Sequence, residues 1–181
     1  MRIEDKILTV KGGELLLRNP READARMLID YLKITCGETR YLVKEPEEIT
    51  MTLEEEEAFI RKQNDSENSL ILLGFLNGRY VGNCSLMGNG PLRYRHRVSM
   101  GIALYQEFTG LGIGRAMIGA LLKIAGQKGF EQVELEVVKD NERAIRLYRE
   151  MGFEICGTFP NNMKYKDGSY ADAYYMVRRL T

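Results

Sequence analysis

The strongest constraint on the fold is a change of hydrophobic period that recurs through the second half of the chain. Residues 97–104 and 132–138 are short apolar runs suited to strands, whereas residues 112–126 and 141–151 repeat apolar side chains at helical spacing. Strands that alternate with amphipathic helices bury their apolar faces by packing the helices on a sheet. The second half therefore predicts a layered α/β arrangement.

The first half and the C-terminal end add a second group of elements. We expect a hairpin of 7–10 and 15–18, helices at 21–33 and 52–63, a hairpin of 70–76 and 79–87, and closing strands at 153–158 and 170–180. Asn19 and Pro20 predict a cap and a first-turn proline for the first helix. Thr52 and Glu55 form a capping box for the second helix. The order of elements implies one mixed sheet with helices packed on it, in the α/β (α+β) class, without a linker.

Composition excludes several classes of protein. Lys plus Arg equals Asp plus Glu among the 181 residues, so no net charge favours nucleic acid or a membrane surface. The basic run 93–97 is short and fits a solvated strand edge. Three scattered cysteines and a single histidine, His96, favour neither a disulfide framework nor a metal site. Without a signal peptide or apolar span, we expect a cytoplasmic protein.

A glycine-rich turn, Gly110-Leu111-Gly112-Ile113-Gly114, joins an expected strand to an expected helix. Glycines let backbone N–H groups approach a ligand closely, and the helix N-terminus adds positive potential, so the turn suits a phosphate group. Arg115-Ala116 follows where a Walker A loop needs Lys and Ser or Thr, and the Rossmann glycine spacing also fails. A connector that binds nothing remains the alternative.

A second pattern follows at residues 141–153. Asn141 is placed as an N-cap, and Ala144, Leu147 and Tyr148 share a helical stripe. Gly152 supplies a left-handed turn before the next strand. An amphipathic helix explains this spacing but does not demand a tyrosine at position 148.

Together, the glycine turn and the string Asn141-x-x-Ala144-x-x-Leu147-Tyr148-x-x-x-Gly152-Phe153 resemble the GNAT N-acetyltransferase superfamily. The resemblance extends to the bacterial branches that acetylate small substrates and ribosomal proteins. It implies a single GNAT-like domain over residues 1–181, with a mixed, mostly antiparallel central sheet of about seven strands and about four helices. It also implies acetyl-CoA as co-substrate, no metal, and direct transfer of the acetyl group to a primary amine.

The resemblance implies a role for each matching position. Thr109 stands where the family's diphosphate loop has Arg or Gln, and Leu104 would polarise the thioester carbonyl through its N–H group. Tyr148 would protonate the leaving thiolate. The implied cofactor-binding residues are Ile102, Ala103, Leu104, Thr109, Gly110, Leu111, Gly112, Ile113, Gly114, Arg115, Asn141, Ala144 and Tyr148.

The general base is less defined by the resemblance. Many relatives carry Glu where this chain has Ser99. Glu38 is the candidate base, because the loop between the first two helices lines the acceptor cleft in this family; a solvated loop carboxylate is its alternative reading. His96 is a further candidate that fits an exposed strand entry equally well.

Two functions remain open from the sequence. The first is an acetyl-CoA-dependent N-acetyltransferase that acts on an unidentified amine, either a small molecule or a protein N-terminus or lysine. The alternative is a non-catalytic acyl-CoA-binding regulatory domain, which Ser99 supports. Neither function predicts a nucleic-acid or membrane partner, and a homodimer is compatible with the resemblance because relatives commonly form dimers.

Overall fold

The computed structural model describes residues 1–88 and 90–180, in which four α-helices and eight strands are connected by short turns. The strands are β1 (Lys6–Val10), β2 (Gly13–Arg18), β3 (Ser69–Leu76), β4 (Arg79–Gly88), β5 (Arg97–Leu104), β6 (Gln132–Val138), β7 (Glu154–Lys164) and β8 (Tyr170–Arg179). The helices are α1 (Ala25–Glu38), α2 (Leu53–Asp65), α3 (Ile113–Gln127) and α4 (Glu142–Glu150).

The described chain forms two compact units that share β5 and α3. Residues 1–87 and 101–121 make the first unit, and residues 88–100 and 122–181 make the second. β5 enters the first unit at Gly101, and α3 leaves it after Leu121. The prediction of one domain over residues 1–181 stays a prediction.

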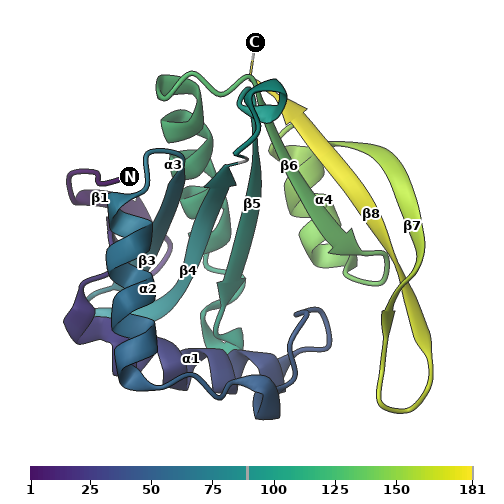
Figure 1. Cartoon of the computed structure of the whole chain (residues 1–181), viewed down its shortest axis with the longest axis horizontal. Coiled ribbons are helices and arrows are strands. Elements are labelled where there is room, and N and C mark those ends of the chain that lie inside the picture. Colours follow the sequence, from purple (N-terminus) through teal and green to yellow (C-terminus); the bar gives the residue numbers. More distant parts are fainter. Residues whose placement is uncertain (89, 181) are drawn as a thin grey trace. The chain divides into compact units, whose positions relative to one another are not determined.

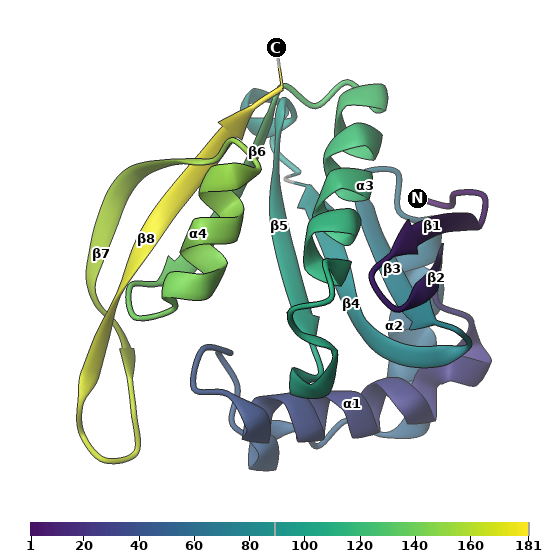
Figure 2. The ribbon, with the colours of Figure 1, turned by 180° about the vertical axis from the view of Figure 1, so that it is seen from behind.

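The first unit is an antiparallel sheet with helices on both faces. Its strands follow the order β1-β2-β3-β4, and the end of β5 adjoins β4. Figures 1 and 2 show α2 on one face and the start of α3 on the other. Ala25 and Leu28 of α1, Ile60 of α2 and Leu73 of β3 form a buried cluster that joins both helices to the sheet. Burial of these apolar side chains is what fixes α1 and α2 on that face.

The second unit contains the parallel pair that makes the sheet mixed. The first half of β5 pairs in parallel with β6, with Ser99 opposite Glu134. β6 then pairs antiparallel with β8, and β8 with β7. In Figure 2, α4 lies on one face of β6 and β8. The expected mixed, mostly antiparallel sheet with about four helices is confirmed, with eight strands instead of about seven.

Local signals located some element boundaries and misplaced others. Thr52 accepts a hydrogen bond from the Glu55 N–H group, and Glu55 accepts one from the Thr52 N–H group, so the capping box is confirmed. Asn19 does not cap a helix. Its side chain instead bonds Ile3 N, Met1 O and Ile71 O, and α1 begins only after a 3₁₀ turn at residues 22–24. The Asn19 side chain therefore bonds residues distant in sequence and does not cap the N-terminus of α1.

The residues described include no helix that is both long and apolar enough to cross a membrane.

Close approach between β4 and β5 depends on Gly82. Its φ of 140° lies in the region that favours glycine, and an added Cβ would lie 2.3 Å from Ala103 O and 2.8 Å from Leu104 Cα. Gly78, in the β3–β4 turn, also has a positive φ of 83°, but an added Cβ there meets nothing within 4 Å. Substitutions at the two positions can therefore distinguish the cost of steric overlap from the cost of backbone strain.

We predict that Gly82→Ala lowers the free energy of unfolding by about 3 kcal/mol or more. The alanine would have an unfavourable φ, and its Cβ would also overlap the backbone of β5. Gly78→Ala, the matched control, should lower it by about 1 kcal/mol from strain alone. Urea denaturation of both variants measures the difference. Equal losses would show that β4 and β5 do not approach as described.

Candidate functional site

The glycine turn opens α3 in the first unit. Gly110 and Gly112 have φ values of 85° and 79°, a region that other residues rarely adopt. Ala116 N donates to Gly112 O at 3.0 Å, so Gly112 accepts the first bond of the helix. The N–H groups of Ile113 and Gly114 have no acceptor within the helix, and a Cβ on Gly112 would meet nothing within 4 Å. The turn therefore offers backbone donors beside open space, as a bound phosphate requires.

The Thr109 side chain is used within the turn. Its hydroxyl donates to Gln106 O at 2.7 Å, and Thr109 N donates to the same oxygen at 3.0 Å. The hydroxyl thus closes the 3₁₀ turn at residues 106–108. The Thr109 hydroxyl is therefore engaged within the turn itself.

Glu38 fastens the end of α1 to the same turn. Its Oε2 accepts a hydrogen bond from Gln106 N at 3.0 Å, and its backbone O accepts one from Gln106 Nε2 at 2.7 Å. The carboxylate is partly exposed. The structure thus brings Glu38, the end of β5 and the glycine turn together in one unit, with Glu38 already engaged by a backbone donor.

An aromatic cluster holds the last residues of β5. The Tyr31 hydroxyl donates to Ala103 O at 2.8 Å. The Tyr31 ring packs edge-on against Tyr80 and Tyr105, each with centroids 5.2 Å away. Burial raises the pKa of Tyr31 and of Tyr80, so both hydroxyls stay protonated and able to donate. Because Ala103 O is taken by Tyr31, the strand backbone at Ile102–Leu104 is fixed before any ligand binds.

The remaining implied cofactor residues lie on α4 of the second unit. Asn141 Oδ1 accepts a hydrogen bond from Ala144 N at 3.2 Å, so the predicted N-cap is confirmed. Tyr148 is buried, with its ring edge-on to Phe153 at a centroid distance of 5.8 Å. Burial raises the pKa of Tyr148 to about 12. A protonated phenol of this kind can donate a proton but is a poor acceptor for one at neutral pH.

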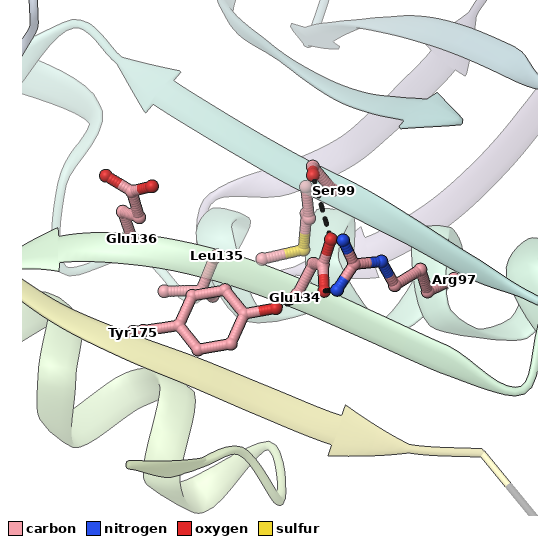
Figure 3. Close-up of a pocket in the computed structure, with 7 residues that line it drawn as sticks. Arg97, Ser99, Glu134, Leu135, Glu136 and Tyr175 are labelled. Carbon is pink, nitrogen blue, oxygen red and sulfur yellow. Dashed lines mark hydrogen bonds and ion pairs between the residues drawn. The ribbon is translucent and has the colours of Figure 1, made fainter. Parts of the chain in front are cut away.

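A charged cavity in the second unit was not predicted. It has a volume of about 630 Å³ and is lined by Arg97, Ser99, Met100, Glu134, Leu135, Glu136 and Tyr175. Figure 3 shows that the Arg97, Ser99 and Tyr175 side chains converge on Glu134, whereas Glu136 stands apart on the same strand. The two glutamates are two residues apart in β6 and so project from the same face.

Glu134 is buried and surrounded by donors. Arg97 forms an ion pair with it at 3.4 Å, Ser99 Oγ donates to Oε1 at 3.4 Å, and the Tyr175 hydroxyl donates to Oε2. Burial and the bond to Glu134 raise the pKa of Tyr175 to about 12. The Glu134 carboxylate therefore lies beside Ser99, the position where many relatives carry a glutamate, and it reaches that place from the neighbouring strand.

The signal for this cavity was present in the sequence as two glutamates in an otherwise apolar strand, but sequence spacing could not show that Tyr175 pairs with Glu136 across β6 and β8. His96 is exposed. Within the described ranges, no group of three or more His, Cys, Asp or Glu side chains is arranged to hold a metal ion.

Comparison with known proteins relates this geometry to a family. The sequence profile of the acetyltransferase (GNAT) family matches residues 36–153. The L-amino acid N-acetyltransferase AaaT of Escherichia coli is 31% identical over 110 residues, which cover 59% of this chain and 66% of that protein. An N-alpha-acetyltransferase of Sulfurisphaera tokodaii is 29% identical over 171 residues, covering 94% and 96%. An uncharacterized Mycobacterium leprae protein is 40% identical over 99 residues, and the match spans 55% of this chain and only 25% of that protein.

Solved structures share the fold. A GNAT-family acetyltransferase from Streptococcus pneumoniae superposes with a TM-score of 0.86 at 29% identity, covering 91% of this chain and 99% of that one. A phosphinothricin acetyltransferase from Sinorhizobium meliloti, solved with acetyl-CoA, has a TM-score of 0.80 at 21% identity, covering 96% and 89%. Because the family profile covers more than half of the sequence and the fold agrees, this chain belongs to the GNAT acetyltransferase family.

Proposed function

We propose that this chain transfers the acetyl group of acetyl-CoA to a primary amine. The proposal depends on two features of the first unit. One is a glycine turn whose first helical N–H groups have no acceptor within the helix; the other is the end of β5, which is bonded to Tyr31 and lies against Gly82. Relatives named as N-acetyltransferases support it, as does the acetyl-CoA bound in the S. meliloti enzyme. The cytoplasmic location and the identity of the amine stay predictions.

The residues of the glycine turn and of the end of β5 fit a diphosphate and a thioester. Gly110–Gly114 supply backbone donors, and the open space at Gly112 leaves room for phosphate oxygens. In β5, Ile102 and Leu104 are the proposed backbone partners of the pantetheine arm, with the Leu104 N–H group polarising the carbonyl. Asn141 and Ala144 are proposed to contact the same arm.

Acetyl transfer requires two proton transfers, one bond formed and one bond broken. The amine loses a proton and its nitrogen forms a bond to the thioester carbon, the carbon–sulfur bond breaks, and the sulfur takes up a proton. Tyr148 is proposed to donate that last proton. An ammonium group with a reference pKa near ~10.4, or about 8 for an α-amine, must first be deprotonated, which calls for a carboxylate or a water relay.

Two carboxylates compete for the role of base. Glu38 is the sequence-based candidate, but its carboxylate already accepts the Gln106 N–H group. Glu136 is exposed, lines the cavity of the second unit and has no hydrogen bond or ion pair to any described residue. We propose that Glu136 accepts the amine proton and that Glu38 acts by positioning the turn at residues 106–108.

The alternative function is an acyl-CoA-binding regulatory domain without turnover. It is favoured by Ser99, which has a hydroxyl where a base would need a carboxylate, and disfavoured by Glu136, an exposed carboxylate that lines the same cavity as Ser99. An acceptor panel with detection of free CoA thiol separates the two functions, because only the enzyme releases thiol in proportion to amine.

We predict that Gly112→Ala weakens acetyl-CoA binding at least tenfold, while it lowers the free energy of unfolding by only about 1 kcal/mol, since the new methyl group meets solvent space and not protein. Isothermal titration calorimetry and urea denaturation measure the two effects. An unchanged dissociation constant would exclude Gly112 from the diphosphate site.

We predict that Tyr148→Phe lowers kcat by about 10² or more and leaves the affinity for acetyl-CoA nearly unchanged, as expected for loss of a general acid. Because the pKa of Tyr148 is raised to about 12, its hydroxyl stays protonated up to that pH, so the wild-type rate should not fall between pH 8 and 10 through this group. Steady-state kinetics with thiol detection across this range checks both statements. A wild-type kcat in the variant would remove Tyr148 from the mechanism.

We predict that Glu136→Gln lowers kcat/KM by about 10² at neutral pH, because the base is lost, and that the loss shrinks as rising pH deprotonates the amine without it. Glu38→Gln keeps an oxygen acceptor for Gln106 N, so the pH profile should keep its shape with a loss of less than about tenfold. The reverse pattern would assign the base to Glu38.

A further inference from the structure

A second cavity lies within the first unit, among α1, α2, β3 and β4. Its volume is about 450 Å³. Apolar side chains make most of its wall, and polar groups are confined to a few positions. The apolar lining residues are Leu28, Leu32, Met51, Phe59, Ile71 and Met87; the polar ones are Lys44, Glu55, Glu56, Asn83 and Ser85.

Glu56 is the unusual member of this lining. It is only 6% exposed, yet its carboxylate has no hydrogen bond and no ion pair within 4 Å to any residue that the structure describes. Burial raises the pKa of Glu56, and the charge of the exposed Lys44 opposes that shift. A buried carboxylate without a partner is costly when it is ionised, so a cationic ligand in the cavity would stabilise its charged form.

The two glutamates that precede Glu56 in α2 do not share this situation. Glu55 accepts a hydrogen bond from Thr52 N in the capping box, and Glu54 is exposed in the first turn. The Glu55 carboxylate is therefore stabilised by helix capping, and the Glu54 carboxylate by solvent. Neither reason accounts for Glu56, which faces apolar walls.

The cavity borders the strand that we assign to the pantetheine arm. A Cβ on Gly101 would lie 3.3 Å from Ser85 Oγ, so Ser85 adjoins β5 immediately before Ile102. On the same strand as Ser85, Asn83 Nδ2 donates to the Tyr80 hydroxyl at 3.1 Å, and Tyr80 packs on Tyr31. The lining residue Ser85 thus lies beside β5, and Glu56 reaches the same cavity from α2.

We propose that this cavity holds the aliphatic chain of the acceptor and that Glu56 pairs with a cationic group at the far end of that chain. This inference rests on the proposed acetyltransferase function and narrows its acceptor to amines with a methylene chain that ends in a second cation. The apolar walls fit the methylene groups, and the single buried carboxylate fits one ammonium group. Two sources supply this chemistry: a free α,ω-diamine, or a lysine side chain next to the amine of a peptide.

The test compares 1,5-diaminopentane with pentylamine as acceptors, since they differ only in the second ammonium group. We expect the wild-type kcat/KM to favour the diamine by about tenfold or more, the effect of one charge-assisted bond. Glu56→Gln keeps the shape of the side chain and should reduce this ratio to near one. Glu54→Gln removes the same charge from an exposed position of the same helix and should keep the wild-type ratio.

A second pair of acceptors distinguishes the sources. The dipeptide amides Ala-Lys and Ala-norleucine differ in the ammonium group alone, so a preference for Ala-Lys that Glu56→Gln abolishes assigns the cavity to a peptide side chain. A preference confined to the free diamine assigns it to a small molecule. If neither pair shows a preference, or if Glu56→Gln leaves the ratios unchanged, the proposal is overturned.

Calorimetry with 1,5-diaminopentane and no acetyl-CoA keeps this inference separate from the proposed function. Binding to the wild type that weakens at least tenfold in Glu56→Gln, without thiol release from any amine, would support the cavity and contradict the acetyltransferase. Thiol release at equal diamine and monoamine rates would support the enzyme and contradict the cavity. A thermal melt confirms that Glu56→Gln is folded.

Discussion

The close approach of β4 to the end of β5 is the contact on which the proposed cofactor strand depends. Only glycine fits at position 82, because a Cβ there would overlap Ala103 O. The Tyr31 hydroxyl also donates a hydrogen bond to Ala103 O, and the Tyr31 ring packs against Tyr80 and Tyr105. A strand end fixed in this way can present the next backbone groups to a ligand without first becoming ordered, which reduces the entropic cost of binding.

Three carboxylates illustrate how the surroundings of a charge determine what it can do. Glu134 is buried but is bonded to Arg97, Ser99 and Tyr175, so its carboxylate organises the cavity around it. Glu136, two residues later, is exposed and uncommitted, which suits a proton acceptor. Glu56 is buried and has no hydrogen bond or ion pair to any described residue, and this is the basis for assigning it a cationic ligand.

Much of the fold could be predicted from sequence because its signals are local. The periods of β5 and β6, the capping box at Thr52 and the cap at Asn141 depend on neighbouring residues alone, and the structure bears them out. Asn19 failed as a cap because its amide found partners at Met1 and Ile71, which no local pattern encodes.

In the candidate site, too, the features that depend on local sequence could be predicted and those that depend on distant residues could not. The glycine turn was evident from its spacing, since positive φ values favour glycine. The Glu134 cluster and the unpaired Glu56 were not evident, because both arise when strands and helices distant in sequence bring their side chains together. Glu38 was singled out by family resemblance, and only the structure showed that its carboxylate holds Gln106.

Hydrogen–deuterium exchange with and without coenzyme A tests the central claim most directly, because it reports on the backbone N–H groups themselves. We expect the ligand to slow exchange in the segment 110–115 and at the end of β5, whose amides would become bonded to the diphosphate and the pantetheine arm. Binding that protects other segments and leaves these amides unchanged would contradict this claim.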